Sequence, residues 1–325
     1  MADILVPLDG STLAERVLPW AATVARATGG QIRFVEAIGY PVTADVIAPV
    51  DDLKAAASDY LDSQVEQVQC TYGVTAKAAA SFGPAAAVIL TEASSGGVDY
   101  IAMSTHARDG VRRAVLGSVA EHVLRESPVP VYLLPAAAHG RELSAIKRIA
   151  IPLDGSALSQ SVLEPAAAFA QQLGATITLI RVYEPPEGAV FDEHGAMVRS
   201  ADQEVDRIAF LAEQYMGPLV RELQRLGVEA NSRSELGHDA ANDIVRLAEA
   251  AEADLIVMAT HGRSGLDRLR HGSVTEQVLR HSHIPLLAFG RIPLKSLLAE
   301  EVRASATSFK IADAFSMPRV VQGVV

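Results

Sequence analysis

Two similar loops hold the residues whose types and spacing best suit the binding of an anion. They read MSTHARDGVRRAVLGSVAE at 103–121 and MATHGRSGLDRLRHGSVTE at 258–276. Each loop ends in Gly-Ser at the start of a predicted helix, where the first N–H groups have no partner inside the helix and the helix dipole is positive. Gly272 lets a phosphate approach the backbone, and the hydroxyls of Ser273 and Thr275 can donate to its oxygens. The pattern predicts a phosphate site at the end of each loop.

A capping box is the alternative explanation for the same helix starts. Ser118 with Glu121, and Ser273 with Glu276, have the spacing at which a serine and a glutamate satisfy backbone N–H groups reciprocally. The long loop before each start favours the phosphate, because a cap alone needs no such loop. In the second loop this stretch includes Gly262.

An aspartate follows the first predicted strand of each half, Asp9 in one and Asp154 in the other. Ligands of open parallel sheets bind beyond the carboxyl ends of the strands, which is where both residues are expected. Each aspartate also precedes a glycine, and Asp-Gly commonly forms a turn. Both residues are therefore turn formers, ligand contacts or both.

The elements that must position these residues occur twice in the chain. Residues 4–11 and 149–156 share six of eight positions, and 101–134 and 256–289 share 16 of 34. The offset rises from 145 to 155 between the two blocks. The second copy therefore holds about ten extra residues, which we place in the stretch 184–200 because loops absorb insertions at little cost.

Strand and helix patterns alternate within each copy. In the first copy the predicted strands are 3–8, 31–37, 74–81, 99–104 and 129–134, and the later predicted helices are 51–69, 85–94 and 118–126. The first helix is expected to begin at a capping box of Thr12 and Glu15 and to kink at Pro19. Alternating units with apolar strands predict an α/β fold of two tandem, open, parallel, Rossmann-like sheets covered by helices on both faces.

Two domains follow from the repeat. The expected ranges are 1–138 for the first, 139–146 for a polar linker, 147–290 for the second and 291–325 for a C-terminal tail. The last strand of each domain would leave an unpaired edge if it were exposed. We therefore expect the two domains to pair within the chain, and two chains can associate further as a homodimer.

Composition narrows the classes of partner. The 325 residues carry a formal net charge of −11, which argues against a nucleic-acid or anionic-membrane partner because such binding depends on Lys and Arg. Cys70 is the single cysteine, so no intrachain disulfide can form. With no basic leader before Ile4 and no apolar run of about 20 residues, a cytoplasmic location is expected.

Catalytic signatures are weak in this sequence. No GxxxxGK, HxGH or SGGxDS motif follows a predicted strand, and no residue pair forms an evident general acid and base. His106 and His261 lack a second ligand at metal spacing, so no metal site and no catalytic residue is predicted.

With these residues in view, both copies resemble the universal stress protein domain, and residues 3–290 resemble a tandem member of its ATP-binding branch. That branch carries the pattern Gly-x2-Gly-x9-Gly-Ser/Thr. Its four positions fall on Ala259, Gly262, Gly272 and Ser273 in the second copy and on Ser104, Ala107, Gly117 and Ser118 in the first. The spacing is kept in both copies, although glycines are replaced.

The resemblance implies ATP as the cofactor, alone or with Mg²⁺, in a stress-response or signalling protein. The implied contacts in the second copy are Pro152, Asp154, Val182, Met258, Ala259, Gly262, Arg263, Ser264, Gly272, Ser273, Val274 and Thr275. Those implied in the first copy are Pro7, Asp9, Ala37, Met103, Ser104, Arg108, Gly117, Ser118, Val119 and Ala120. The alternatives are a scaffold without nucleotide, in which the repeats serve only for pairing, and an enzyme with slow ATP hydrolysis.

The departures from the pattern make the two sites unequal. Ala107 replaces the second glycine in the first copy, and alanine in a left-handed backbone conformation costs on the order of 1 kcal/mol. Its Cβ also occupies space next to the phosphates. We expect the second copy to bind ATP more tightly and the first site to be weak or empty.

Overall fold

The computed structural model describes eight segments of the chain, residues 1–39, 50–105, 117–138, 146–183, 190–191, 197–199, 202–260 and 274–290. The predicted tail, 291–325, and most of the predicted linker, 139–145, lie outside these segments. The described residues all belong to one compact unit that ends at Arg291. The two copies can therefore be compared element by element.

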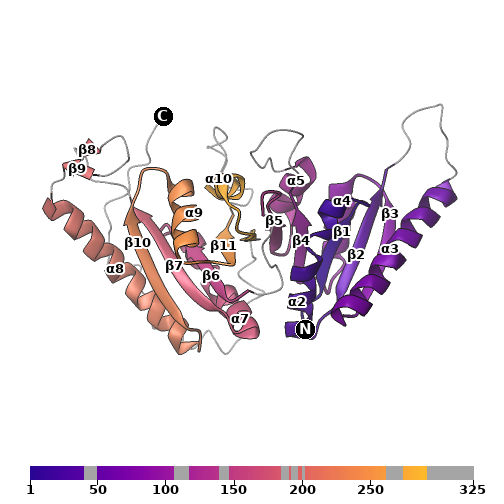
Figure 1. Ribbon diagram of the computed structural model, residues 1–325, viewed down its shortest axis with the longest axis horizontal. Coiled ribbons are helices and arrows are strands. Elements are labelled where there is room, and N and C mark those ends of the chain that lie inside the picture. Colours follow the sequence, from indigo (N-terminus) through magenta and orange to yellow (C-terminus); the bar gives the residue numbers. More distant parts are fainter. Residues whose placement is uncertain are drawn as a thin grey trace. The chain divides into compact units, whose positions relative to one another are not determined.

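Copy one contains a parallel sheet in the order β3-β2-β1-β4-β5. Its strands are β1 (Ile4–Leu8), β2 (Ile32–Ile38), β3 (Ala76–Phe82), β4 (Tyr100–Ser104) and β5 (Val131–Leu134). Its helices are α1 (Thr12–Glu15), α2 (Leu18–Thr28), α3 (Val50–Tyr72), α4 (Ala85–Ser94) and α5 (Ser118–Glu126). Helix α2 packs beside α3, and α4 beside α5, on opposite faces of the sheet (Figure 1). The predicted α/β fold is confirmed.

Copy two repeats this arrangement in the order β10-β7-β6-β11-β12. Its strands are β6 (Arg148–Pro152), β7 (Thr176–Tyr183), β10 (Ala230–Leu236), β11 (Leu255–Ala259) and β12 (Leu286–Phe289). Its helices are α6 (Ala157–Gln160), α7 (Leu163–Leu173), α8 (Asp202–Arg225), α9 (Ala240–Ala250) and α10 (Val274–His281). The stretch 184–200, predicted to be irregular, contains a short antiparallel pair, β8 (Val190–Phe191) and β9 (Met197–Arg199).

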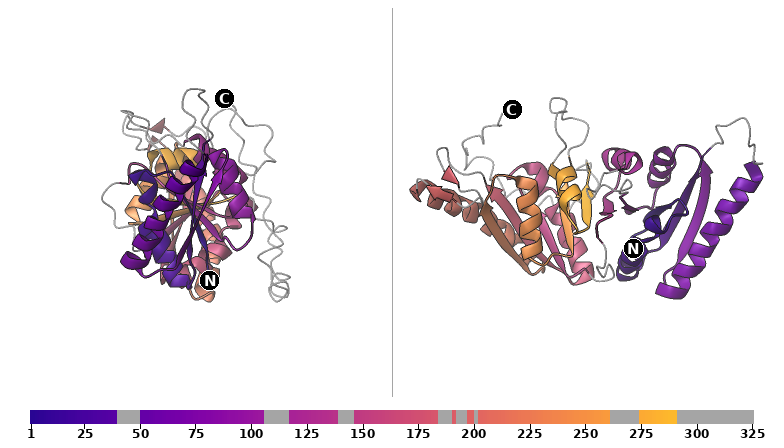
Figure 2. Two further views of the ribbon diagram at one scale, coloured as in Figure 1. Left: turned by 90° about the vertical axis from the view of Figure 1, so that its right-hand side faces the viewer. Right: turned by 45° about the horizontal axis from the view of Figure 1, so that its top comes forward.

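Strands β5 and β12 pair antiparallel and join the strands of both copies into one ten-stranded sheet. Leu133 lies opposite Leu286 in this register, and Tyr132 lies opposite Leu287. All four side chains are almost completely buried. Each of these two strands therefore covers the backbone edge of the other, so neither edge is left unpaired. The turned views in Figure 2 show helices on both faces of this sheet.

An aromatic cluster that includes Tyr132 of β5 packs next to this strand pair. Trp20 on α2 stacks on Tyr132 of β5, with the ring centroids 3.9 Å apart and the planes 15° from parallel. Phe169 on α7 lies 6.4 Å from Trp20 and 5.7 Å from Tyr100 at the start of β4. Because Phe169 belongs to copy two and the other rings to copy one, the cluster connects the two copies through apolar contact.

The first helix of copy one differs in detail from the expectation. Ser11, not Thr12, caps α1, because its hydroxyl accepts from the N–H of Ala14 at 3.2 Å. The helix stops at Glu15 and a second one, α2, starts at Leu18 with Pro19 in its first turn. Proline is tolerated there because the missing N–H has no intrahelical partner at that position. No helix in the described segments is long and apolar enough to cross a membrane.

Replacing Trp20 tests the importance of the aromatic cluster. We expect Trp20→Ala to lower the free energy of unfolding by about 3–5 kcal/mol, because a buried indole and its ring contacts are lost and a cavity remains. Urea unfolding followed by circular dichroism measures the change. Phe210→Ala is the matched control, since Phe210 is 58% exposed and its removal should change stability by less than about 0.5 kcal/mol. Equal losses in the two variants would contradict the assignment.

Candidate functional site

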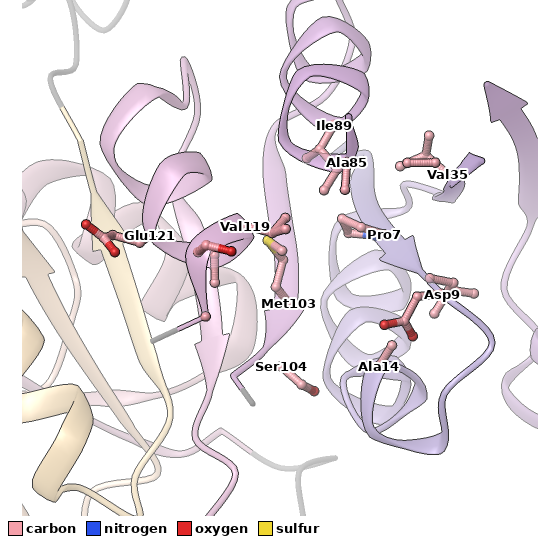
Figure 3. A pocket seen from close by; sticks show the side chains of 15 residues that line it. Pro7, Asp9, Ala14, Val35, Ala85, Ile89, Met103, Ser104, Val119 and Glu121 are labelled. Atoms are coloured by element: carbon pink, nitrogen blue, oxygen red, sulfur yellow. The ribbon is translucent and has the colours of Figure 1, made fainter. Parts of the chain in front are cut away.

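A cavity of about 570 Å³ opens in copy one at the carboxyl ends of β1, β2 and β4 (Figure 3). It lies where the chain order of the sheet reverses, since β1 pairs with β2 on one side and with β4 on the other. Nine of the ten residues predicted for the first copy line it, namely Pro7, Asp9, Ala37, Met103, Ser104, Gly117, Ser118, Val119 and Ala120. The tenth, Arg108, lies outside the described residues.

The remaining lining residues were missed by the sequence reasoning. They are Leu8, Ala14, Val35, Ala85, Ile89 and Glu121. Two signals could have found part of them. Val35 lies two positions before Ala37 on a strand, so both side chains face the same side of the sheet. Ala85 and Ile89 are four positions apart on α4 and share one helix face, but nothing in the sequence shows that this face borders the cavity.

The start of α5 does not form the capping box that was the alternative explanation. Its N-cap is Gly117, with φ −64° and ψ 152°, and within the described part of the chain no side chain caps it. Ser118 is instead the exposed first residue of the helix. Because the first-turn N–H groups lack a side-chain acceptor, the positive end of the helix is available to a ligand in the cavity.

Asp9 forms a turn and also lines the cavity. Its Oδ1 accepts from the N–H of Ser11 at 3.0 Å and from the Ser11 hydroxyl at 2.5 Å. Gly10, between them, has φ +77°, a conformation that favours glycine. The turn role is therefore confirmed, and Asp9 also lies on the wall of the cavity.

Asp154 forms the corresponding turn in copy two. Its Oδ1 accepts from the N–H of Ser156 at 2.8 Å. Burial raises the pKa of this carboxyl, but hydrogen bonds from Ser156 and Ser159 outweigh burial and hold the pKa below its ordinary value. Asp154 is thus an ionised turn residue just after β6.

Copy two is described only in part around its predicted site. Pro152, Val182, Met258 and Ala259 lie at or near the carboxyl ends of β6, β7 and β11, and Val274 and Thr275 begin α10. Thr275 is 4% exposed and its hydroxyl donates to the carbonyl of Ala259 at 3.5 Å, so this group is engaged within the protein. Gly262, Arg263, Ser264, Gly272 and Ser273 lie outside the described residues.

The two copies carry opposite charges beside the equivalent aspartates. Glu36 of β2 corresponds, at the offset of 145, to Arg181 of β7. The Glu36 Oε2 atom is buried with no hydrogen-bond partner in the described segments, and burial together with the charge of Asp9 raises the pKa of this carboxyl. Arg181 instead donates to the carbonyl of Leu153 at 3.3 Å and lies 4.9 Å above the Tyr215 ring.

The helices that cover this face also differ in charge between the two copies. Tyr60 of α3 donates its hydroxyl to Glu15 at 2.9 Å, whereas the corresponding Tyr215 of α8 interacts with Gln160 at 2.9 Å. Copy one thus gathers carboxylates here, while copy two replaces one by an amide and another by a guanidinium. The alignment of the two copies contains these replacements of charged residues. Only the structure shows that the replaced residues lie close together.

Comparison with known proteins agrees with the geometry. The model of the universal stress protein family matches residues 1–135 and 145–290. Universal stress protein MJ0531 of Methanocaldococcus jannaschii is 32% identical over 149 residues, which cover 43% of this chain and 80% of that protein. Universal stress protein Slr1230 of Synechocystis sp. is 25% identical over 316 residues, which cover 89% of this chain and 100% of that protein.

Solved structures show the same architecture. A universal stress protein from Archaeoglobus fulgidus superimposes with a TM-score of 0.66 at 23% identity, over 89% of this chain and 98% of its own. A protein from Pseudomonas aeruginosa described as functionally unknown superimposes with a TM-score of 0.62 at 17% identity, over 89% of this chain and 92% of its own. At these identities the structural likeness supports the fold.

The pH dependence of stability tests the buried carboxylate. Because the pKa of Glu36 is raised in the folded state, the native protein holds its proton more firmly, and stability falls as pH rises from about 4 through that raised pKa. We expect Glu36→Gln to raise the melting temperature at pH 7 and to have little effect below about pH 4. Thermal unfolding over a pH series measures the difference.

Arg181→Gln is the matched variant in copy two. It should lower stability at pH 7 by about 1 kcal/mol, because a hydrogen bond to Leu153 and a cation–π contact with Tyr215 are lost. A loss of stability in Glu36→Gln at pH 7 would show that the carboxylate has a favourable partner, contrary to the prediction.

Proposed function

The chain belongs to the universal stress protein family, and we propose that it binds an adenine nucleotide, ATP, in a stress-response or signalling role. The observation that carries the proposal is the cavity of copy one. Nine residues that the family resemblance implies at a nucleotide site line this single cavity, although they are spread from Pro7 to Ala120 along the chain. A family pattern without a site would not require such convergence.

The shape and chemistry of the cavity fit the two ends of a nucleotide. Its volume lies within the range of about 300–1,000 Å³ that is usual for small-molecule sites. Val35, Ile89 and Met103 form an apolar wall against which a purine ring can pack. Asp9 can accept a hydrogen bond from an amine or hydroxyl of the ligand, and the uncapped start of α5 suits a phosphate.

We place the tighter site in copy two. The support comes from the sequence, because copy two keeps Gly262 and Gly272 whereas copy one has Ala107 in place of the former. A Cβ at that position restricts the backbone and takes space next to the phosphates. In this proposal copy one is a weaker site or an empty one.

The nucleotide is proposed to act through the paired copies. Strands β5 and β12 share one register, and Phe169 of copy two packs against Trp20 and Tyr100 of copy one. A ligand that stabilises one copy therefore also stabilises the unit that partners meet. In this proposal, whether nucleotide occupies the sites determines how the paired copies interact with partner proteins.

Identification of small molecules released by heat from the purified protein tests the proposal directly. Adenine nucleotide in the supernatant supports it, and its absence together with no binding of added ATP would favour a scaffold without nucleotide. ATP turnover above that of a Gly272→Val chain would instead indicate a hydrolase.

Two glycine variants test the inequality of the sites. We expect Gly272→Val to weaken the tighter ATP site at least tenfold, because the added side chain blocks the approach of phosphate to the backbone. Gly117→Val should leave that site unchanged. Gly117 has an extended backbone that valine adopts without strain, so any effect on the weaker site reports close approach of the ligand. Isothermal titration with ATP measures both, and full affinity in Gly272→Val would refute the assignment.

A further inference from the structure

Ser104 places a buried hydroxyl without a partner at the edge of the cavity. It is the last residue of β4, is 7% exposed, and its Oγ has no hydrogen-bond partner in the segments that the structure describes. A buried hydroxyl that lacks a partner costs free energy, so native proteins rarely keep one. A molecule that enters the cavity can supply this partner.

The neighbouring hydroxyl shows what a structural role looks like at this strand end. Thr105 is fully buried, and its Oγ1 accepts from the N–H of Ala136 at 3.1 Å. In copy two the corresponding Thr260 donates to the carbonyl of Phe289 at 3.3 Å. Thr105 thus binds the segment just after β5, and Thr260 binds the last residue of β12. Ser104 takes no part in this arrangement.

The direction of the Ser104 side chain leads to the crevice between β1 and β4. In Figure 3 it extends toward the side on which Asp9 and Ala14 lie, and all three residues line the cavity. Asp9 accepts from Ser11, so its carboxylate is held in place by the turn. A ligand in this crevice meets a hydroxyl donor on one wall and a carboxylate acceptor on the other.

The hydroxyl is specific to copy one. At the offset of 155, Ser104 corresponds to Ala259, so copy two has no side-chain donor at this position. The pattern of the family has a glycine here, which also carries no donor. Copy one has therefore gained a polar group at the position where copy two keeps an apolar one.

We propose that Ser104 is a specificity-determining residue of copy one, whose hydroxyl donates to an acceptor oxygen of the bound ligand. The acceptor is a phosphate or a hydroxyl oxygen of a nucleotide, so this inference rests on the proposed function. In this proposal copy one is a distinct site with its own ligand preference.

The decisive variant is Ser104→Ala, which gives copy one the side chain that copy two has. We expect two effects of opposite sign. The affinity of copy one for ATP falls about tenfold, because a hydrogen bond to the ligand is lost. The melting temperature of the protein without ligand stays the same or rises, because a buried group without a partner is removed. A residue with only a structural role would not show this combination.

Titration calorimetry in a chain that also carries Gly272→Val reports binding to copy one. ATP and adenosine are used as separate probes. A loss of affinity for ATP alone identifies a phosphate oxygen as the acceptor, and a loss for both places the acceptor on the nucleoside; either result supports the proposal. Thr105→Val is the matched control, expected to lower the melting temperature because it leaves the N–H of Ala136 unpaired.

Two outcomes would overturn the proposal, and they can be told apart. ATP and adenosine affinities that do not change in Ser104→Ala would show that the hydroxyl does not donate to the ligand, whatever the melting temperature does. A melting temperature that also falls, as in Thr105→Val, would show that water or protein satisfies the hydroxyl. Either result removes the inference and leaves the proposed function standing. No binding of ATP or adenosine by the unaltered chain would remove the proposed function and the inference with it.

Discussion

Parallel pairing of β1 with both β2 and β4 is the constraint on which the candidate site depends. Parallel strands bring their carboxyl ends to the same edge, and β2 and β4 lie on opposite sides of β1. The crevice therefore results from the strand order of the sheet and needs no particular residue there. The turn at Asp9 and the start of α5 supply polar groups to it, while β2 and α4 supply its apolar wall. The same constraint acts in copy two, where β6 lies between β7 and β11.

A shared backbone leaves the two copies free to differ in chemistry. Glu36 and Arg181 occupy equivalent strand positions, yet one is a carboxylate that lacks a partner in the described segments and the other is held by Leu153 and Tyr215. Ser104 and Ala259 differ in the same way at the end of the fourth strand. These differences change charge and hydrogen bonding but not the path of the backbone. The pairing of the strands does not depend on whether the side chains at these positions are polar or apolar.

Much of the fold could be predicted because apolar periodicity and the internal repeat are local signals. The helices 85–94 and 118–126 were placed at their observed bounds, since each is flanked by clear start and stop residues. Ser11 was missed as the cap of α1 because Thr12, one position later, fits the same rule. The β8–β9 pair was missed because its strands are too short for periodicity to show.

Loop residues of the cavity were found from their spacing, whereas Ala85 and Ile89 were not, because packing across the sheet decides which helix face borders a cavity. The uncapped start of α5 likewise depends on backbone geometry that Ser118 and Glu121 do not reveal.

The antiparallel pair of β5 and β12 also has a consequence for synthesis on the ribosome. Leu133 and its partner Leu286 are 153 positions apart, and all strands of copy one lie before the second of them. At a translation rate of about 5–20 residues per second, the edge of β5 waits roughly 8–30 s for the strand that covers it. During that interval the nascent chain presents an apolar edge strand to other chains. Slow translation of the second half lengthens the exposure of this edge.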